Sequence, residues 1–153
     1  MEYETIEREL FIEATPEIVF DVVSSPDHLT QWWPDDAAYN PTPGSTGRIV
    51  FVGGDAGDIV AGFAVVDAQP PRLFSFRWTQ PVDEPAEIGN SLLVTFELTA
   101  TAGGTMLRMT ETGFRDMNWD VVTLEAQFAE HEHGWDFFLP RLPSYVATLV
   151  TRP

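Results

Sequence analysis

One histidine and one carboxylate, His131 and Glu111, are the best candidates for chemistry in this chain. His131 lies in a run of apolar residues, one helical turn from both Phe128 and Trp135. Glu111 falls on the apolar face of an alternating segment, beside Met109. An imidazole titrates near neutral pH and can donate to or accept from a bound molecule. A buried carboxylate needs a partner, so we expect Glu111 to meet His131, an arginine or a polar group of a ligand.

Both residues also have a purely structural explanation. A histidine on an apolar stripe is often a core residue with satisfied hydrogen bonds, and Glu111 could reach water from the end of its segment. Acting together on a bound hydrophobic substrate, the two could instead serve as general acid and base. The sequence leaves these alternatives open.

Other chemistry finds little support. In the run Glu130-His131-Glu132-His133, histidines two residues apart on a helix point about 200° apart, so they cannot share one metal ion. The chain has no cysteine and no lysine, and its serines lack the G-x-S-x-G context of an activated nucleophile. No glycine-rich loop has nucleotide-binding spacing. We therefore expect no metal and no cofactor.

Large apolar side chains form the second group of candidate site residues. We expect them to face inward, where they would either fill a core or line a pocket for a small hydrophobic or aromatic molecule between helix and sheet. Together with Glu111 and His131, the candidate ligand-binding residues are Trp32, Trp33, Phe51, Phe63, Phe76, Trp78, Phe96, Met109, Phe128, Trp135 and Phe138.

The composition limits the partners. The chain has 24 acidic residues against 8 basic ones, all arginine, for a formal net charge of −16. This charge repels phosphate backbones and anionic membranes, so we expect no nucleic-acid binding. No apolar stretch is long enough to insert into a membrane, and the acidic start lacks the features of a signal peptide. We expect a cytoplasmic protein, with its oligomeric state left open.

A long amphipathic segment, 120–150, must position His131. Its apolar residues recur mostly every three, four or seven positions, which predicts a helix of about thirty residues. The apolar stripe comprises Val121, Leu124, Phe128, Trp135, Leu139, Leu142, Val146 and Leu149.

Three residues interrupt this predicted helix. Pro140 and Pro143 cannot donate backbone hydrogen bonds, which predicts a kink or break between residues 139 and 143. Gly134 has no side chain, so we expect a neighbouring strand or loop to approach closely beside Trp135.

Alternating segments predict an antiparallel sheet with one apolar face, which the final helix must cover. The first of these segments, 4–13, alternates between apolar and polar residues, except that Arg8 lies on its apolar side. Two helix starts follow it, Thr15-Pro16-Glu17 and Ser25-Pro26-Asp27, the second helix running to Trp32, and then a loop, 34–47. The predicted strands are 4–13, 48–52, 58–68, 72–79, 91–99 and 105–112. The fold class is therefore α+β, with six strands in one domain, 1–153.

The order and spacing of several short motifs resemble the START-like (SRPBCC) superfamily. Within it, the resemblance is to the branch of homologues of the ATPase activator of the ninety-kilodalton heat-shock protein. The motifs cover nearly the whole chain: Thr15-Pro16-Glu17-Ile18-Val19-Phe20, Ser25-Pro26-Asp27-His28-Leu29, Trp32-Trp33, Gly62, Pro70-Pro71-Arg72-Leu73, Trp78, Val94-Thr95-Phe96-Glu97-Leu98, Gly103-Gly104-Thr105, Thr110-Glu111-Thr112-Gly113-Phe114 and Gly134-Trp135.

The resemblance implies a helix-grip fold, a curved sheet wrapped around the terminal helix over a cavity. It is specific for the fold and not for a function. The implied functions are binding of a small hydrophobic molecule, interaction with a chaperone, and a cyclase- or hydrolase-type reaction using His131 and Glu111. Pro140 and Pro143 depart from the smooth terminal helix expected of such a fold.

Overall fold

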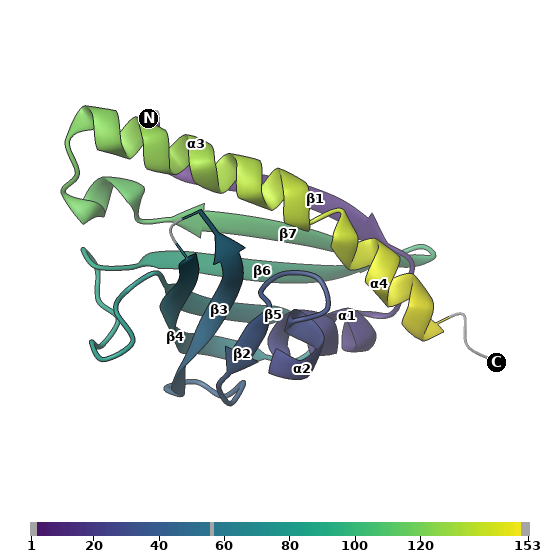
Figure 1. Ribbon diagram of the computed structural model, residues 1–153. Coiled ribbons are helices and arrows are strands. Elements are labelled where there is room, and N and C mark those ends of the chain that lie inside the picture. Colours follow the sequence, from purple (N-terminus) through teal and green to yellow (C-terminus); the bar gives the residue numbers. More distant parts are fainter. Residues whose placement is uncertain (1–2, 56, 151–153) are drawn as a thin grey trace.

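A curved antiparallel sheet holding a long helix is the architecture of the computed structural model, which describes residues 3–55 and 57–150 (Figure 1). The strands are β1 (Thr5–Ile12), β2 (Asp36–Ala38), β3 (Thr46–Gly54), β4 (Gly57–Gln69), β5 (Leu73–Trp78), β6 (Leu92–Thr101) and β7 (Gly104–Thr112). The helices are α1 (Pro16–Ser24), α2 (Pro26–Leu29), the 3₁₀ helix η1 (Phe114–Met117), α3 (Val121–Phe138) and α4 (Arg141–Val150).

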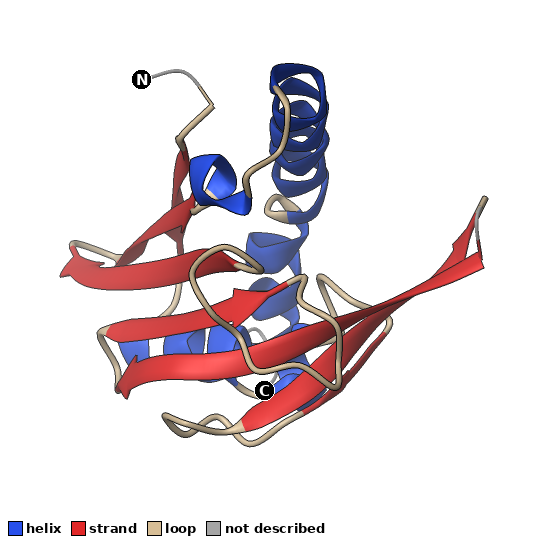
Figure 2. Cartoon of the chain, turned by 90° about the vertical axis from the view of Figure 1, so that its left-hand side faces the viewer, coloured by secondary structure: helices blue, strands red, loops and turns tan. Residues whose placement is uncertain are grey.

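The sheet runs in the order β1-β7-β6-β5-β4-β3-β2, with every neighbouring pair antiparallel. The first strand therefore pairs with the last one, while the remaining neighbours follow the chain. Turned by 90°, the sheet is seen to bend around the helices (Figure 2). This arrangement agrees with the helix-grip fold that the family resemblance implies.

The alternation of apolar residues places the predicted side chains on the inner face. Phe76 lies opposite Val94, which in turn lies opposite Glu111 on β7. All three are fully buried, with exposed fractions of 0%. Because side chains alternate between the two faces of a strand, this register brings Glu111 into the apolar layer under the helix.

The sheet has seven strands rather than the predicted six. The additional strand, β2, lies within the predicted loop 34–47, where Asp36 pairs with Val50 and Ala38 with Arg48. Three residues are too few to show alternation, so only the pairing with β3 defines this strand. The second short helix also ends earlier than predicted, at Leu29 instead of Trp32.

The terminal helix is broken where the prolines predict it. α3 ends at Phe138 and α4 begins at Arg141, so Pro140 lies in the break. The helix starts with Asp120 as N-cap, whose carboxylate accepts from the backbone N–H of Thr123 at 2.7 Å. The stripe is buried from Leu124 to Val146, but Val121, at 67% exposed, lies outside it.

A glycine in β3 is required by the close approach of the chain after β2. A Cβ atom on Gly47 would lie 1.9 Å from the carbonyl oxygen of Ala38 and 2.8 Å from the Cβ of Tyr39. Neither atom belongs to a side chain that can swing away, so any larger residue forces the backbone to shift.

We predict that Gly47→Ala lowers the free energy of unfolding by about 1–3 kcal/mol, measured by urea denaturation. The control is Gly134→Ala, because a Cβ at that position meets nothing within 4 Å. Gly44 would not serve as a control, because its positive φ of 89° would strain any other residue. Equal stability of Gly47→Ala and the unmodified protein would contradict the close approach.

Candidate functional site

The centre of the site is Glu111, which is fully buried at the end of β7. Its Oε2 accepts a hydrogen bond from the indole N–H of Trp78 at 2.7 Å. Its Oε1 accepts from the indole N–H of Trp135 at 2.8 Å and lies 2.9 Å from Nδ1 of His131. Three donors on β5 and α3 thus satisfy one carboxyl group on β7. Of the three kinds of partner expected for Glu111, the structure supplies His131.

His131 is mostly buried, with 13% of its side chain exposed. Burial lowers the pKa of its imidazole, but the hydrogen bond and negative charge of Glu111, with the charge of Glu130, outweigh it and hold the pKa above its ordinary value of 6.5. Trp78 and Phe114 pack against the ring, with centroids at 5.4 Å each. The imidazole is therefore fixed in place and favours the protonated state.

A pocket of about 120 Å³ opens beside this pair, between α3 and strands β3 and β5. Six of the sequence-predicted residues line it: Trp33, Phe51, Trp78, His131, Trp135 and Phe138. The aromatic rings pack closely around it, with the centroid of Trp33 4.9 Å from that of Trp135 and 5.0 Å from that of Trp78. Glu111 lies behind the wall, bonded to two of its indoles.

Six other predicted residues belong to the packed core and do not line this pocket: Trp32, Phe63, Phe76, Phe96, Met109 and Phe128. They face inward, as their spacing predicts, but neighbouring rings fill the space beside them. Phe63, for example, stacks between Phe76 at 4.2 Å and Tyr39 at 4.3 Å. Alternation identifies an inward side chain, and it cannot distinguish a packed one from one beside a void.

Two lining residues, Glu130 and Gly134, were not among the predicted ones. Glu130 precedes His131 and reaches the pocket from an exposed position on α3. The expectation for Gly134 was wrong: a Cβ there would meet nothing within 4 Å, so no strand or loop among residues 3–55 and 57–150 packs against that side of the glycine. The missing side chain instead leaves open space in the pocket wall. The sequence signal that could have identified Gly134 as a lining residue was its place next to Trp135, which was a predicted site residue.

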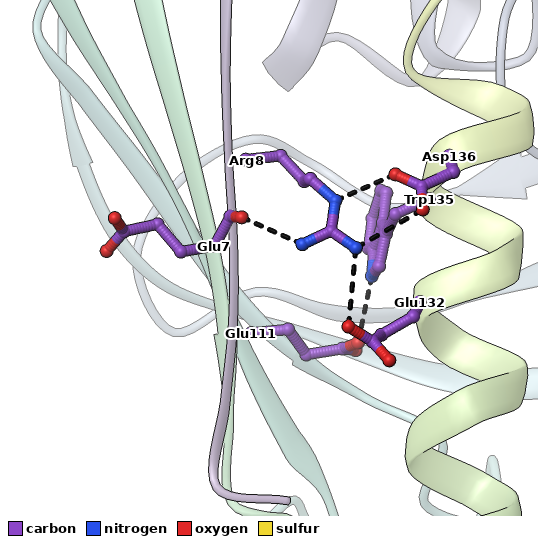
Figure 3. Close-up of polar contacts among 6 residues, drawn as sticks. All are labelled: Glu7, Arg8, Glu111, Glu132, Trp135 and Asp136. Atoms are coloured by element: carbon purple, nitrogen blue, oxygen red, sulfur yellow. Dashed lines mark hydrogen bonds and ion pairs between the residues drawn. The ribbon is translucent and has the colours of Figure 1, made fainter.

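Arg8 fastens the opposite side of α3 to the edge strand β1 (Figure 3). Its Nε lies 2.7 Å from Oδ1 of Asp136, and a second nitrogen lies 3.4 Å from Oε2 of Glu132. That second nitrogen also lies 3.2 Å from Oδ2 of Asp136, and the third nitrogen donates to the backbone oxygen of Glu7 at 2.9 Å. These ion pairs explain why an arginine occurs on the apolar side of the first strand: it lies across from the acidic flank of α3.

A larger hollow of about 370 Å³ lies on this side, between β1 and the helix break. It is lined in part by Arg8, Asp136 and Pro140, and it shares Trp135 with the first pocket. Its main charged groups already pair with each other, whereas the smaller pocket is lined by His131, whose Nδ1 contacts the buried Glu111. We therefore treat the smaller aromatic pocket as the candidate site.

Two further features bear on function. Among residues 3–55 and 57–150, no three or more histidine, aspartate or glutamate side chains are grouped so that they could hold a metal ion. None of the helices in these ranges is both long and apolar enough to cross a membrane.

The fold has many known relatives in structure. Protein MLL2253 from Mesorhizobium loti is 25% identical, with a TM-score of 0.75 over 97% of this chain and 99% of that one. Protein NE0264 from Nitrosomonas europaea is 15% identical, with a TM-score of 0.76 over 99% of both chains. The Aha1 dimer from Colwellia psychrerythraea is 22% identical, with a TM-score of 0.70 over 93% of this chain and 95% of that one.

The curved sheet and gripped helix thus define a protein of the START-like class. More narrowly, residues 13–147 match the family described as Activator of Hsp90 ATPase homolog 1-like protein, and the chain belongs to this family. No curated protein matches the chain in sequence.

We predict that Gly134→Ala raises the free energy of unfolding by about 1 kcal/mol, because alanine costs less entropy than glycine in a helix and the new methyl group enters open space. Chemical denaturation of the two proteins measures this difference. A loss of stability would show that the space beside α3 is occupied.

A second prediction concerns pH. Since the pKa of His131 is raised in the folded state, the protonated imidazole stabilises the fold fully below pH 6.5, and this contribution is lost as pH rises through the raised pKa. The free energy of unfolding should therefore fall as pH rises above 6.5.

His131→Gln should reduce this pH dependence, measured by urea denaturation at several pH values. The matched control is His133→Gln, because His133 is exposed on the same helix. If His133→Gln reduced the pH dependence as much as His131→Gln, the assignment to the Glu111–His131 pair would be wrong.

Proposed function

We propose that this protein binds a small molecule carrying an aromatic or other apolar group in the pocket between α3 and the sheet. The observation that carries this proposal is the pocket wall itself. Five aromatic side chains surround an open space beside a glycine, and the polar residues of the lining are Glu130 and His131, the latter held by Glu111. Apolar walls with few, fixed polar groups are typical of small-molecule sites.

The size of the pocket limits what it can take. At about 120 Å³, it is comparable to an apolar cavity of about 150 Å³ that binds benzene. It therefore suits one ring or a branched alkyl group, with any remainder of the ligand lying outside, past Phe51 and Phe138. Phe137, which is 61% exposed and packs on Phe138 at 4.9 Å, extends the apolar surface beyond the pocket.

His131 is the residue that would give the ligand an orientation. Its Nδ1 is engaged by Glu111, so its Nε2 is the atom available to a hydroxyl or carbonyl group. Glu111 does not line the pocket and its oxygens already accept three N–H groups. Acid–base catalysis on a bound molecule would thus fall to His131 alone, which favours binding over the cyclase- or hydrolase-type alternative.

Interaction with a chaperone is a second candidate, favoured by the family description and by the Aha1 structure among the relatives. The test is the ATPase rate of Hsp90 from the same organism with and without this protein. An unchanged rate at saturating protein would count against it.

We predict that single-ring aromatics such as p-cresol and benzyl alcohol raise the thermal unfolding temperature, because a ligand that binds only the folded state stabilises it. Gly134→Leu should abolish the shift, since its side chain would fill the open space beside the glycine. Ala129→Leu adds the same side chain at an exposed position of α3 and should leave the shift unchanged. Loss of the shift in both variants, or in neither, would contradict binding in this pocket.

A further inference from the structure

The indoles of the pocket wall turn their polar ends away from the cavity. Trp78 and Trp135 both line the pocket, yet the N–H group of each donates to Glu111 behind the wall. The atoms that they present to a bound molecule are therefore ring carbons. The faces of aromatic rings carry partial negative charge and attract cations, tryptophan most strongly.

The charge around the pocket is predominantly negative. Glu111 lies directly behind the two indoles, and Glu130 lines the pocket from α3. The lining contains no lysine or arginine, and its one basic group is His131. When His131 is neutral, the lining residues and Glu111 behind them carry two negative charges and no positive one.

One cation of the chain already packs on this wall. The guanidinium carbon of Arg141 lies 5.7 Å from the ring centroid of Phe138, within the usual range of a cation–π contact. Phe138 is in turn 6.1 Å from Phe51 across the pocket. The aromatic rim thus makes a cation–π contact in the protein itself.

We propose that the pocket selects organic cations, in particular an ammonium group bearing methyl or other small alkyl substituents. This inference rests on the proposed function and names the chemical class of its ligand. Such a group is apolar on its surface and positively charged, which matches aromatic walls backed by carboxylates. A trimethylammonium group is also compact enough for a pocket of about 120 Å³.

Binding of a cation should be coupled to the charge of His131. The charged groups that act on its imidazole are Glu111 from β7 and Glu130 from α3, while β5 and η1 contribute the uncharged rings of Trp78 and Phe114. A protonated His131 neutralises Glu111 and repels a second cation nearby. Affinity for the cation should therefore rise with pH as His131 loses its proton.

The test compares choline with 3,3-dimethylbutan-1-ol, its neutral isostere with carbon in place of nitrogen. Both are titrated into the protein at pH 8 while tryptophan fluorescence and heat are recorded. We expect choline to bind about tenfold more tightly, and its affinity to fall at pH 6 while that of the isostere stays constant. Added salt should weaken only the choline complex.

Two variants separate the charge of the pocket from the charge of the whole protein. Glu130→Gln should weaken choline binding about two- to fivefold and leave the isostere unaffected. Glu125→Gln removes the same charge from an exposed position of the same helix, outside the lining, and should change neither affinity.

The outcomes also separate this inference from the proposed function. Equal binding of the two probes, or tighter binding of the isostere, would overturn the selection of cations and leave an apolar pocket in place. If neither probe nor the single-ring aromatics bound, both proposals would fail. A loss of choline binding equal in Glu125→Gln and Glu130→Gln would also overturn the inference, because it would report net charge alone.

Discussion

The buried carboxylate of Glu111 is the interaction on which the rest of the site depends. An unpaired carboxylate at this depth would be costly, and donors from two elements meet it: Trp78 from β5, and Trp135 and His131 from α3. These bonds fix the rotation of α3 on the sheet, because a helix turned or shifted by one residue would withdraw both of its donors. They also hold two indoles with their rings toward the pocket.

The packing around α3 is asymmetric, and this asymmetry places the pocket. On the β1 side, Arg8 fastens the helix through Asp136 and Glu132 (Figure 3). On the other side, Gly134 carries no side chain that could reach β3, and a cavity remains there. The break at Pro140 then redirects the chain, so that α4 continues over the sheet at a different angle (Figure 1). The aromatic pocket and the ion pairs of Arg8 therefore lie on opposite flanks of one helix.

Much of the fold could be predicted because it depends on local patterns. Alternation identified the inner faces of β5, β6 and β7, and Thr15-Pro16-Glu17 and Ser25-Pro26-Asp27 marked the starts of α1 and α2. Pro140 marked the break. The short strand β2 could not be predicted, since three residues carry no period and only pairing with β3 defines them. The predicted end of α2 at Trp32 was also wrong: the helix ends at Leu29, and residues 30–32 form a turn.

The sequence by itself determined which residues face inward, including His131 and Glu111, because helical and strand periods act through the backbone of one segment. Only the tertiary structure decided that these two meet, that Trp33 lines a void while Trp32 is packed, and that Gly134 opens space rather than allowing close contact. The reason is physical: a cavity is the space left between several elements, and its position depends on how side chains of distant segments fit together. The spacing of apolar residues within one segment carries no information about how that segment fits against the others.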